Sequence, residues 1–180
     1  EILAVVQSID TAVKIGEDCD YSVISSFGFD GERWFMVDMV RAKLELPELI
    51  GAAVAAYEKW APKEVLIEDT PTGVALRRYM RDRRLVSRLQ GVDGDKAERL
   101  NMAMPMLYAG DLRFPLDQQW TDVVRRELVG FPSARHDDIV DTISQFVNWH
   151  RRFCNEGWIV QEVYGLPHYR ERRRSPRDWR

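Results

Sequence analysis

The chain has 180 residues, of which 45% are hydrophobic and 31% are charged, and it contains two cysteines. This length and composition suit one domain with a packed core and exclude a collagen-like or disordered chain. Two cysteines are too few for a disulfide framework, so we expect a reducing compartment such as the cytoplasm. No apolar run approaches the ~20 residues of a membrane span, and we expect no membrane partner.

The formal net charge of −3 is distributed unevenly along the chain. Residues 170–180 hold six arginines against two acids, a local charge of +4, which leaves −7 for residues 1–169. A second basic cluster occupies residues 77–99. Clusters of this kind bind phosphates in some proteins and form ordinary solvated helix faces in others, and the sequence leaves both interpretations open.

The first third of the chain has the pattern of an antiparallel meander. Residues 2–9 form a continuous apolar run that predicts a buried strand, and Asp10 follows at its end. Residues 21–29 and 33–41 are rich in strand-forming side chains and are separated by Asp-Gly-Glu, a hairpin signature. We therefore expect three consecutive paired strands.

The middle of the chain has the pattern of a crossover between parallel strands. Helical spacing of apolar residues predicts a helix over residues 47–60, and residues 63–67 predict a strand that ends at Glu68. A helix is expected over residues 70–83 and a further strand over 86–92. The alternation of strand and helix makes this part of the sheet parallel.

The last part of the chain is mainly helical. We expect helices over residues 95–109, with Asp95 as N-cap and Glu98 as its capping-box partner, and over residues 118–128 and 136–153. Residues 111–114 are expected to be a short extended piece. The whole pattern predicts an α/β fold with a mixed five-stranded sheet flanked by helices.

Carboxylates recur at positions where this fold can gather them. They are Asp10 and Glu68 at strand ends and Asp137, Asp138 and Asp141 at the head of the last helix. Asp residues at a helix N-terminus are often only solvated partners of the helix dipole. If the three sites converge, however, the carboxylates repel one another unless a cation holds them ionised, and an all-oxygen set suits Mg²⁺ or Mn²⁺ rather than Zn²⁺. Two such ions ~4 Å apart can promote phosphodiester hydrolysis.

The order of these motifs resembles the ribonuclease H-like fold and, more narrowly, the C-terminal nuclease domain of a tailed-phage terminase large subunit. The resemblance extends over about residues 5–147 and rests on five segments, which are residues 8–22, 65–73, 94–99, 109–115 and 127–141. Each motif is weak alone, and their common order carries the resemblance.

The resemblance implies a set of site residues. It places the first catalytic carboxylate on Asp10, the second on Glu68 and the third within Asp137, Asp138 and Asp141, all five being candidate ligands of two Mg²⁺ or Mn²⁺ ions. We predict Asp138 as the third, because Asp138 and Asp141 also resemble the paired helix acids of Holliday-junction resolvases. Helical geometry alone does not decide between these acids. The candidate DNA contacts are Lys96, Arg99, Arg77, Arg78 and Arg81.

The resemblance also implies partners and a domain plan. The expected substrate is double-stranded DNA, cut during viral genome packaging in the cytoplasm of an infected bacterium. An N-terminal packaging ATPase domain of the same full-length chain is expected, which agrees with a sequence that opens on Glu1 within a strand. Portal and small terminase subunit are further expected partners. Residues 1–154 are predicted to form the nuclease domain and residues 155–180 an Arg-rich extension.

Two other functions stay open at this point. The first is a Holliday-junction resolvase or a ribonuclease H-type nuclease, which would share the fold and the carboxylates. The second is a catalytically silent docking module of the packaging motor, in which the acids are structural and the Arg-rich extension binds another subunit.

Overall fold

The computed structural model describes residues 1–11, 21–91, 94–134 and 136–154. The predicted Arg-rich extension, residues 155–180, lies outside the described residues, and its role stays a prediction. None of the helices in the described ranges is both long enough and apolar enough to span a membrane.

The predicted meander is present. Strands β1 (Ala4–Asp10), β2 (Ser22–Phe29) and β3 (Trp34–Ala42) pair in antiparallel order. At the β2–β3 turn the Asp30 carboxylate accepts hydrogen bonds from the two backbone N–H groups of Glu32 and Arg33, which closes the hairpin. β1 begins two residues later than predicted because Ile2 and Leu3, although apolar, are exposed.

The predicted crossover is also present. Helix α1 (Leu46–Trp60) connects β3 to β4 (Glu64–Glu68), which lies parallel to β1. Helix α2 (Pro71–Asp82) then leads to β5 (Arg88–Gln90), parallel to β4. β5 is shorter than the predicted range of residues 86–92, of which residue 92 lies outside the described residues.

The C-terminal part contains the three predicted helices and a short strand where the sequence indicated only an extended piece. They are α3 (Lys96–Tyr108), β6 (Leu112–Arg113), α4 (Thr121–Gly130) and α5 (Asp138–Cys154). β6 pairs in parallel with β3, so the sheet has six strands in the order β5-β4-β1-β2-β3-β6 and the five-stranded prediction was one short. A two-residue strand is too short to produce a period-two pattern in sequence.

Side-chain caps fix where two helices begin. The Thr70 hydroxyl accepts a hydrogen bond from the backbone N–H of Gly73 at 3.0 Å, at the start of α2. The Asp95 carboxylate accepts from the backbone N–H of Glu98 at 2.8 Å, at the start of α3, which confirms the predicted N-cap. α5 starts at Asp138 rather than at residue 136.

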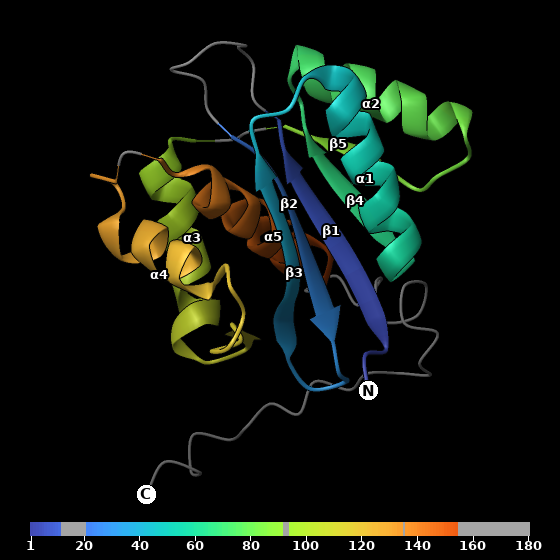
Figure 1. Cartoon of the computed structure of the whole chain (residues 1–180). Coiled ribbons are helices and arrows are strands. Elements are labelled where there is room, and N and C mark those ends of the chain that lie inside the picture. Colours follow the sequence, from blue (N-terminus) through green and yellow to red (C-terminus); the bar gives the residue numbers. More distant parts are fainter. Residues whose placement is uncertain (12–20, 92–93, 135, 155–180) are drawn as a thin grey trace, which may run out of the picture.

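The sheet separates two apolar layers (Figure 1). Helices α1 and α2 cover one face, where Leu49 and Leu76 pack against Ile9 and Ile67. Helices α3, α4 and α5 cover the other face, where Phe146 of α5 stacks on Phe27 of β2 with ring centroids 4.1 Å apart. The acidic head of α5 is thus held against the C-terminal ends of the central parallel strands.

Candidate functional site

Asp10 and Glu68 occupy the last positions of two neighbouring parallel strands. In β1, Ile9 packs on the α1 and α2 side whereas the Ser8 hydroxyl reaches Gln145 of α5, so the alternation of a strand points Asp10 toward α5. The same alternation applies in β4 to Ile67 and Glu68. Because Ile9 and Ile67 are register partners, the two carboxylates are neighbours on the α5 face.

The backbone around this pair is tightly held. The hydroxyls of Thr11 and Thr70 are 2.7 Å apart, which ties the end of β1 to the start of α2. A Cβ atom at Gly73 would lie 2.0 Å from the carbonyl oxygen of Glu68, so only glycine lets α2 begin this close to the strand. The backbone N–H of Asp69 donates to the carbonyl of Gln90 in β5.

The electrostatics of the pair are unusual because no basic side chain among the described residues neutralises it. Burial raises the pKa of Asp10 well above its ordinary value, and the hydrogen bond with Glu68 and the charges of Glu68, Asp141 and Asp138 raise it further. Within the described part of the chain, neither Asp10 nor Glu68 forms an ion pair. In the metal-free protein, Asp10 therefore keeps its proton at a pH where an isolated aspartate has lost it.

The acids at the head of α5 have different surroundings. Asp141 faces the groove beside Asp10 and forms ion pairs of 2.8 Å with both Lys96 and Arg99 of α3. Lys96 also pairs with Asp137, which precedes the helix, at 2.8 Å. Partial burial lowers the pKa of the Lys96 ammonium, but its hydrogen bonds to Asp137 and Asp141 outweigh burial and raise that pKa.

Asp138 is buried on the side of α5 that faces β3 and α4. It lies 3.9 Å from the guanidinium of Arg41, which pairs with Glu127 of α4 at 2.9 Å. The other oxygen of Glu127 accepts the backbone N–H of Ile139, so Glu127 caps α5 from outside the helix. Burial raises the pKa of Glu127, against the lowering effect of Ile139 and Arg41.

Sequence reasoning did not assign roles to Arg41 or Glu127. Arg41 lies in a strand whose pattern gave no sign of a functional residue, and its guanidinium stacks 3.7 Å from the ring centre of Tyr21. Glu127 is the first residue of the last of the five segments that resemble the terminase family, and this position was the one feature of the sequence that could have indicated its role. The ion pair itself joins residues 86 positions apart, which no local pattern can reveal.

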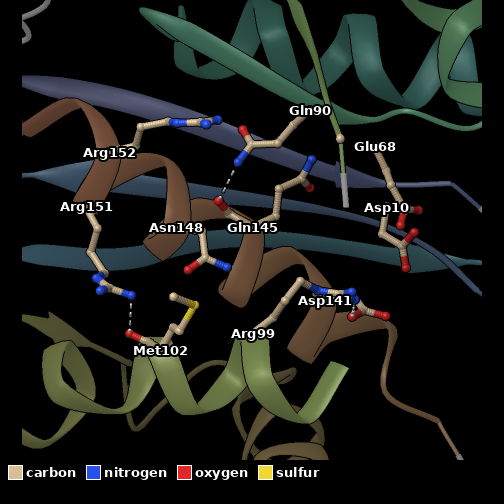
Figure 2. A pocket seen from close by; sticks show the side chains of 11 residues that line it. Asp10, Glu68, Gln90, Arg99, Met102, Asp141, Gln145, Asn148, Arg151 and Arg152 are labelled. Carbon is tan, nitrogen blue, oxygen red and sulfur yellow. Dashed lines mark hydrogen bonds and ion pairs between the residues drawn. The ribbon is translucent and has the colours of Figure 1, made fainter. Parts of the chain in front are cut away.

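A groove of about 330 Å³ opens at the acid pair, between α5, α3 and the end of β5 (Figure 2). Of the predicted site residues, the structure brings Asp10, Glu68, Asp141 and Arg99 together in this groove. Lys96 and Asp137 are linked to it through Asp141, and Asp138 lies close enough to raise the pKa of Asp10.

Three predicted DNA contacts lie elsewhere, on α2, the helix that packs on the opposite face of the sheet from α5 (Figure 1). They are Arg77, Arg78 and Arg81. The structure does not bring them to the groove, and their contact with DNA stays a prediction.

The carboxylates of Asp10 and Glu68 are suitable ligands for a hard divalent cation, but the structure does not place a third ligand from the described residues beside them. Asp10 and Glu68 offer adjacent carboxylate oxygens with no counter-charge from the described part of the chain, and Mg²⁺ or Mn²⁺ would supply one. In the described ranges, no group of three or more His, Cys, Asp or Glu side chains is arranged as a ready metal site. Asp141 is held by two basic side chains instead, so a third ligand from α5 requires the partners of that helix to change.

No protein-family model and no curated protein sequence matches this chain. Solved structures do match. The magnesium-bound large terminase nuclease from thermophilic phage G20c aligns with a TM-score of 0.60 and 16% identity, over 80% of this chain and 81% of that one. The Thermus phage P74-26 large terminase nuclease domain aligns with a TM-score of 0.57 and 19% identity, over 78% and 77%.

A large terminase from another thermophilic bacteriophage aligns with a TM-score of 0.61 and 13% identity over 82% of this chain. The match spans 40% of that longer protein. At these identities the comparisons establish the fold, and the chain has the ribonuclease H-like fold predicted from its sequence. More narrowly, it is the fold of the nuclease domains of phage large terminases, so the predicted structural resemblance is confirmed.

Proposed function

We propose that this chain is the nuclease domain of a phage terminase large subunit and hydrolyses phosphodiester bonds of double-stranded DNA in a reaction that depends on divalent metal ions. The observation that carries the proposal is the half-buried Asp10–Glu68 pair, which opens on a groove and lacks a basic partner among the described residues. The fold supports it, and the G20c nuclease with this fold was solved with magnesium, zinc or cobalt bound.

Each carboxylate has a role in this proposal. Asp10 and Glu68 hold the metal ions, and Asp138 is the predicted third catalytic carboxylate, with Asp141 and Asp137 as the other candidate ligands. Two Mg²⁺ or Mn²⁺ ions would supply an activated water and stabilise the leaving oxygen. Asp10 must be ionised to act as a ligand, so metal binding would require the loss of its proton.

The groove position of Asp141 makes it a competitor for the third role. It faces Asp10 across the groove, whereas Asp138 is held near Arg41 and Glu127. Asp138→Asn and Asp141→Asn separate the two assignments. The variant that loses metal-dependent cutting while keeping its melting temperature identifies the third ligand.

The wider setting follows from the same proposal. The domain cuts concatemeric viral DNA during genome packaging in the cytoplasm of an infected bacterium, attached to an N-terminal ATPase domain of the full-length chain. The portal and the small terminase subunit are its further partners. Lys96 and Arg99 are candidate contacts to DNA phosphates, because a metal ion held by Asp141 would leave both side chains available for that role.

A plasmid-nicking assay in Mn²⁺, Mg²⁺, Ca²⁺ or EDTA tests the proposal. We expect cutting in Mn²⁺ or Mg²⁺ that disappears in EDTA and in Asp10→Asn and Glu68→Gln. Asp69→Asn is the matched control, because it removes one carboxylate charge from an exposed neighbour of Glu68. Equal cutting by the wild type and a folded Asp10→Asn variant would overturn the metal assignment.

A substrate panel then tests the two other functions. Preferential cutting of four-way junctions or RNA–DNA hybrids over linear duplex would indicate a resolvase or a ribonuclease H instead. Absence of both cutting and metal binding, with another packaging protein still bound, would indicate a docking module.

A further inference from the structure

The groove that starts at the acid pair continues along α5 well beyond it (Figure 2). Asp141, Gln145, Asn148 and Arg152 lie at spacings of four, three and four residues, so they share one face of the helix. From Asp141 to Arg152 this face is ~16 Å long, at 1.5 Å per residue. Met102 and Arg99 of α3 line one wall, and Gln90 of β5 lines the other. The site is therefore an elongated channel with the acids at one end.

Gln145 lies in the middle of this channel with one half of its amide satisfied. Its side-chain oxygen accepts a hydrogen bond from the Ser8 hydroxyl at 2.8 Å, which fixes the orientation of the amide. Its side-chain nitrogen is buried and donates to no acceptor in the described part of the chain. A buried donor without an acceptor costs free energy, so an acceptor supplied from outside the described residues would stabilise this nitrogen.

The charge along the channel changes sign from one end to the other. The acids lie at the β1 and β4 end, and Arg151 and Arg152 lie at the end of α5. Arg151 donates to the carbonyl of Met102 at 3.3 Å, and Arg152 forms no ion pair within the described ranges. Both arginines are exposed and keep N–H groups available for an anion.

We propose that this channel binds the sugar–phosphate backbone of the DNA strand that is cut. The side-chain nitrogen of Gln145 donates to a phosphate oxygen beside the scissile bond. Arg151 and Arg152 contact phosphates farther along the strand. The assignment rests on the proposed nuclease function. A volume of about 330 Å³ suits part of one strand and not a whole duplex. A nucleic-acid strand offers the repeated acceptors and negative charge that this series of amide and guanidinium donors requires.

The Arg151→Gln/Arg152→Gln double variant tests the far end of the channel. Its matched control is Arg125→Gln/Arg126→Gln, which removes two exposed arginines from α4, outside the groove. Binding to labelled duplex is measured in Ca²⁺ over a salt series, and cutting is measured in Mn²⁺. We expect the channel variant to bind ~10-fold more weakly, with a salt slope shallower by ~1 for each lost phosphate contact. KM should rise while kcat changes little, and the control should match the wild type.

Gln145→Met tests the near end, because methionine has a similar volume and no amide donor. We expect kcat/KM to fall ~10-fold, as for the loss of one hydrogen bond to a charged group, while the rise in melting temperature on adding Mn²⁺ is unchanged. If the wild type cuts DNA and both channel variants bind and cut as it does, the channel assignment is wrong and the proposed function stands. If the wild type cuts nothing in any metal, the proposed function fails and the assignment fails with it.

Discussion

Two groups of carboxylates lie near the first turn of α5, one half-buried and one buried, and they differ in counter-charge. Asp10 and Glu68 share a hydrogen bond and have no basic partner in the described part of the chain. Glu127, in contrast, lies 2.9 Å from the guanidinium of Arg41, with Asp138 3.9 Å from the same group. The first group has no counter-charge among the described residues, whereas the second has one in Arg41.

The two groups therefore have different roles: one positions α5, and the other is the proposed metal site. Arg41 and Glu127 hold the head of α5, and with it Asp138 and Asp141, at the ends of β1 and β4. The Asp10–Glu68 pair remains available to bind a cation, because no basic side chain in the described part of the chain pairs with it. The Arg41–Glu127 ion pair thus helps to hold α5 beside a carboxylate pair that has no cation among the described residues.

The largest effect is expected from breaking the neutralised group. Glu127→Ala leaves Arg41 buried with one distant acid and removes the cap on Ile139, so we expect a loss of about 3 kcal/mol in the free energy of unfolding. Urea denaturation followed by circular dichroism measures it. Asp122→Ala on the same helix removes an exposed pair with Arg125 and should cost under ~1 kcal/mol. Equal effects of the two variants would show that the Arg41–Glu127 pair does not hold α5.

His150, a half-buried side chain that forms no ion pair within the described ranges, gives the next effect. Burial lowers the pKa of His150 to about 4, and its ring packs against Trp34 and Phe146. The unfolded chain binds a proton at His150 below its ordinary pKa of 6.5 while the folded protein does not, so stability falls as pH falls. Between pH 7 and pH 5 this contributes a loss of about 2 kcal/mol. His150→Gln should flatten this part of the pH dependence, and an unchanged profile would contradict the assignment.

Asp10 should change the pH dependence of stability in the direction opposite to His150. Because the pKa of Asp10 is raised in the folded protein, folding binds a proton there, and stability falls as pH rises above the ordinary pKa of the carboxyl. Asp10→Asn removes this cost, so the metal-free variant should melt at a higher temperature than the wild type at neutral pH. The change should be smaller than that of Glu127→Ala.

Adding metal should reverse the order of the melting temperatures of the wild type and Asp10→Asn. Mn²⁺ should raise the melting temperature of the wild type and leave that of Asp10→Asn nearly unchanged, because the variant lacks one ligand. Scanning calorimetry with and without EDTA measures both. A wild type that is insensitive to Mn²⁺ would remove the physical basis of the proposed metal site.

The sequence predicted the sheet around this site well because its signals are local. Apolar runs ending in Asp10 and Glu68, the Asp30 hairpin and the Asp95 cap all depend on neighbouring residues, and each is present in the structure. The two-residue strand β6 has no such signal, since it is defined only by its pairing with β3.

The sequence indicated that Asp10, Glu68 and Asp141 could meet, and the structure brings them to one groove, but the sequence did not indicate which side chains pair with them. A helix pattern places Asp138 and Asp141 in one turn, but which of them faces Asp10 depends on how α5 is rotated against the sheet. That rotation is set by Phe146 on Phe27 and by Glu127 on Ile139, contacts between distant parts of the chain. The buried amide of Gln145 is apparent only once Ser8 is known to hold its oxygen.

The smallest effect is expected at Lys96, the exposed member of the charges around Asp141. Its side chain is 49% exposed, whereas that of Arg99 is 12% exposed, although both lie 2.8 Å from the same carboxylate. Lys96→Met should therefore change the free energy of unfolding by under ~1 kcal/mol, and Arg99→Met by more. The Lys96 effect should disappear near 1 M salt, where the Debye length is ~3 Å, while the Arg99 effect persists. Equal, salt-resistant losses would show that both cations belong to the folded core, and that Asp141 is not free to change partners when metal binds.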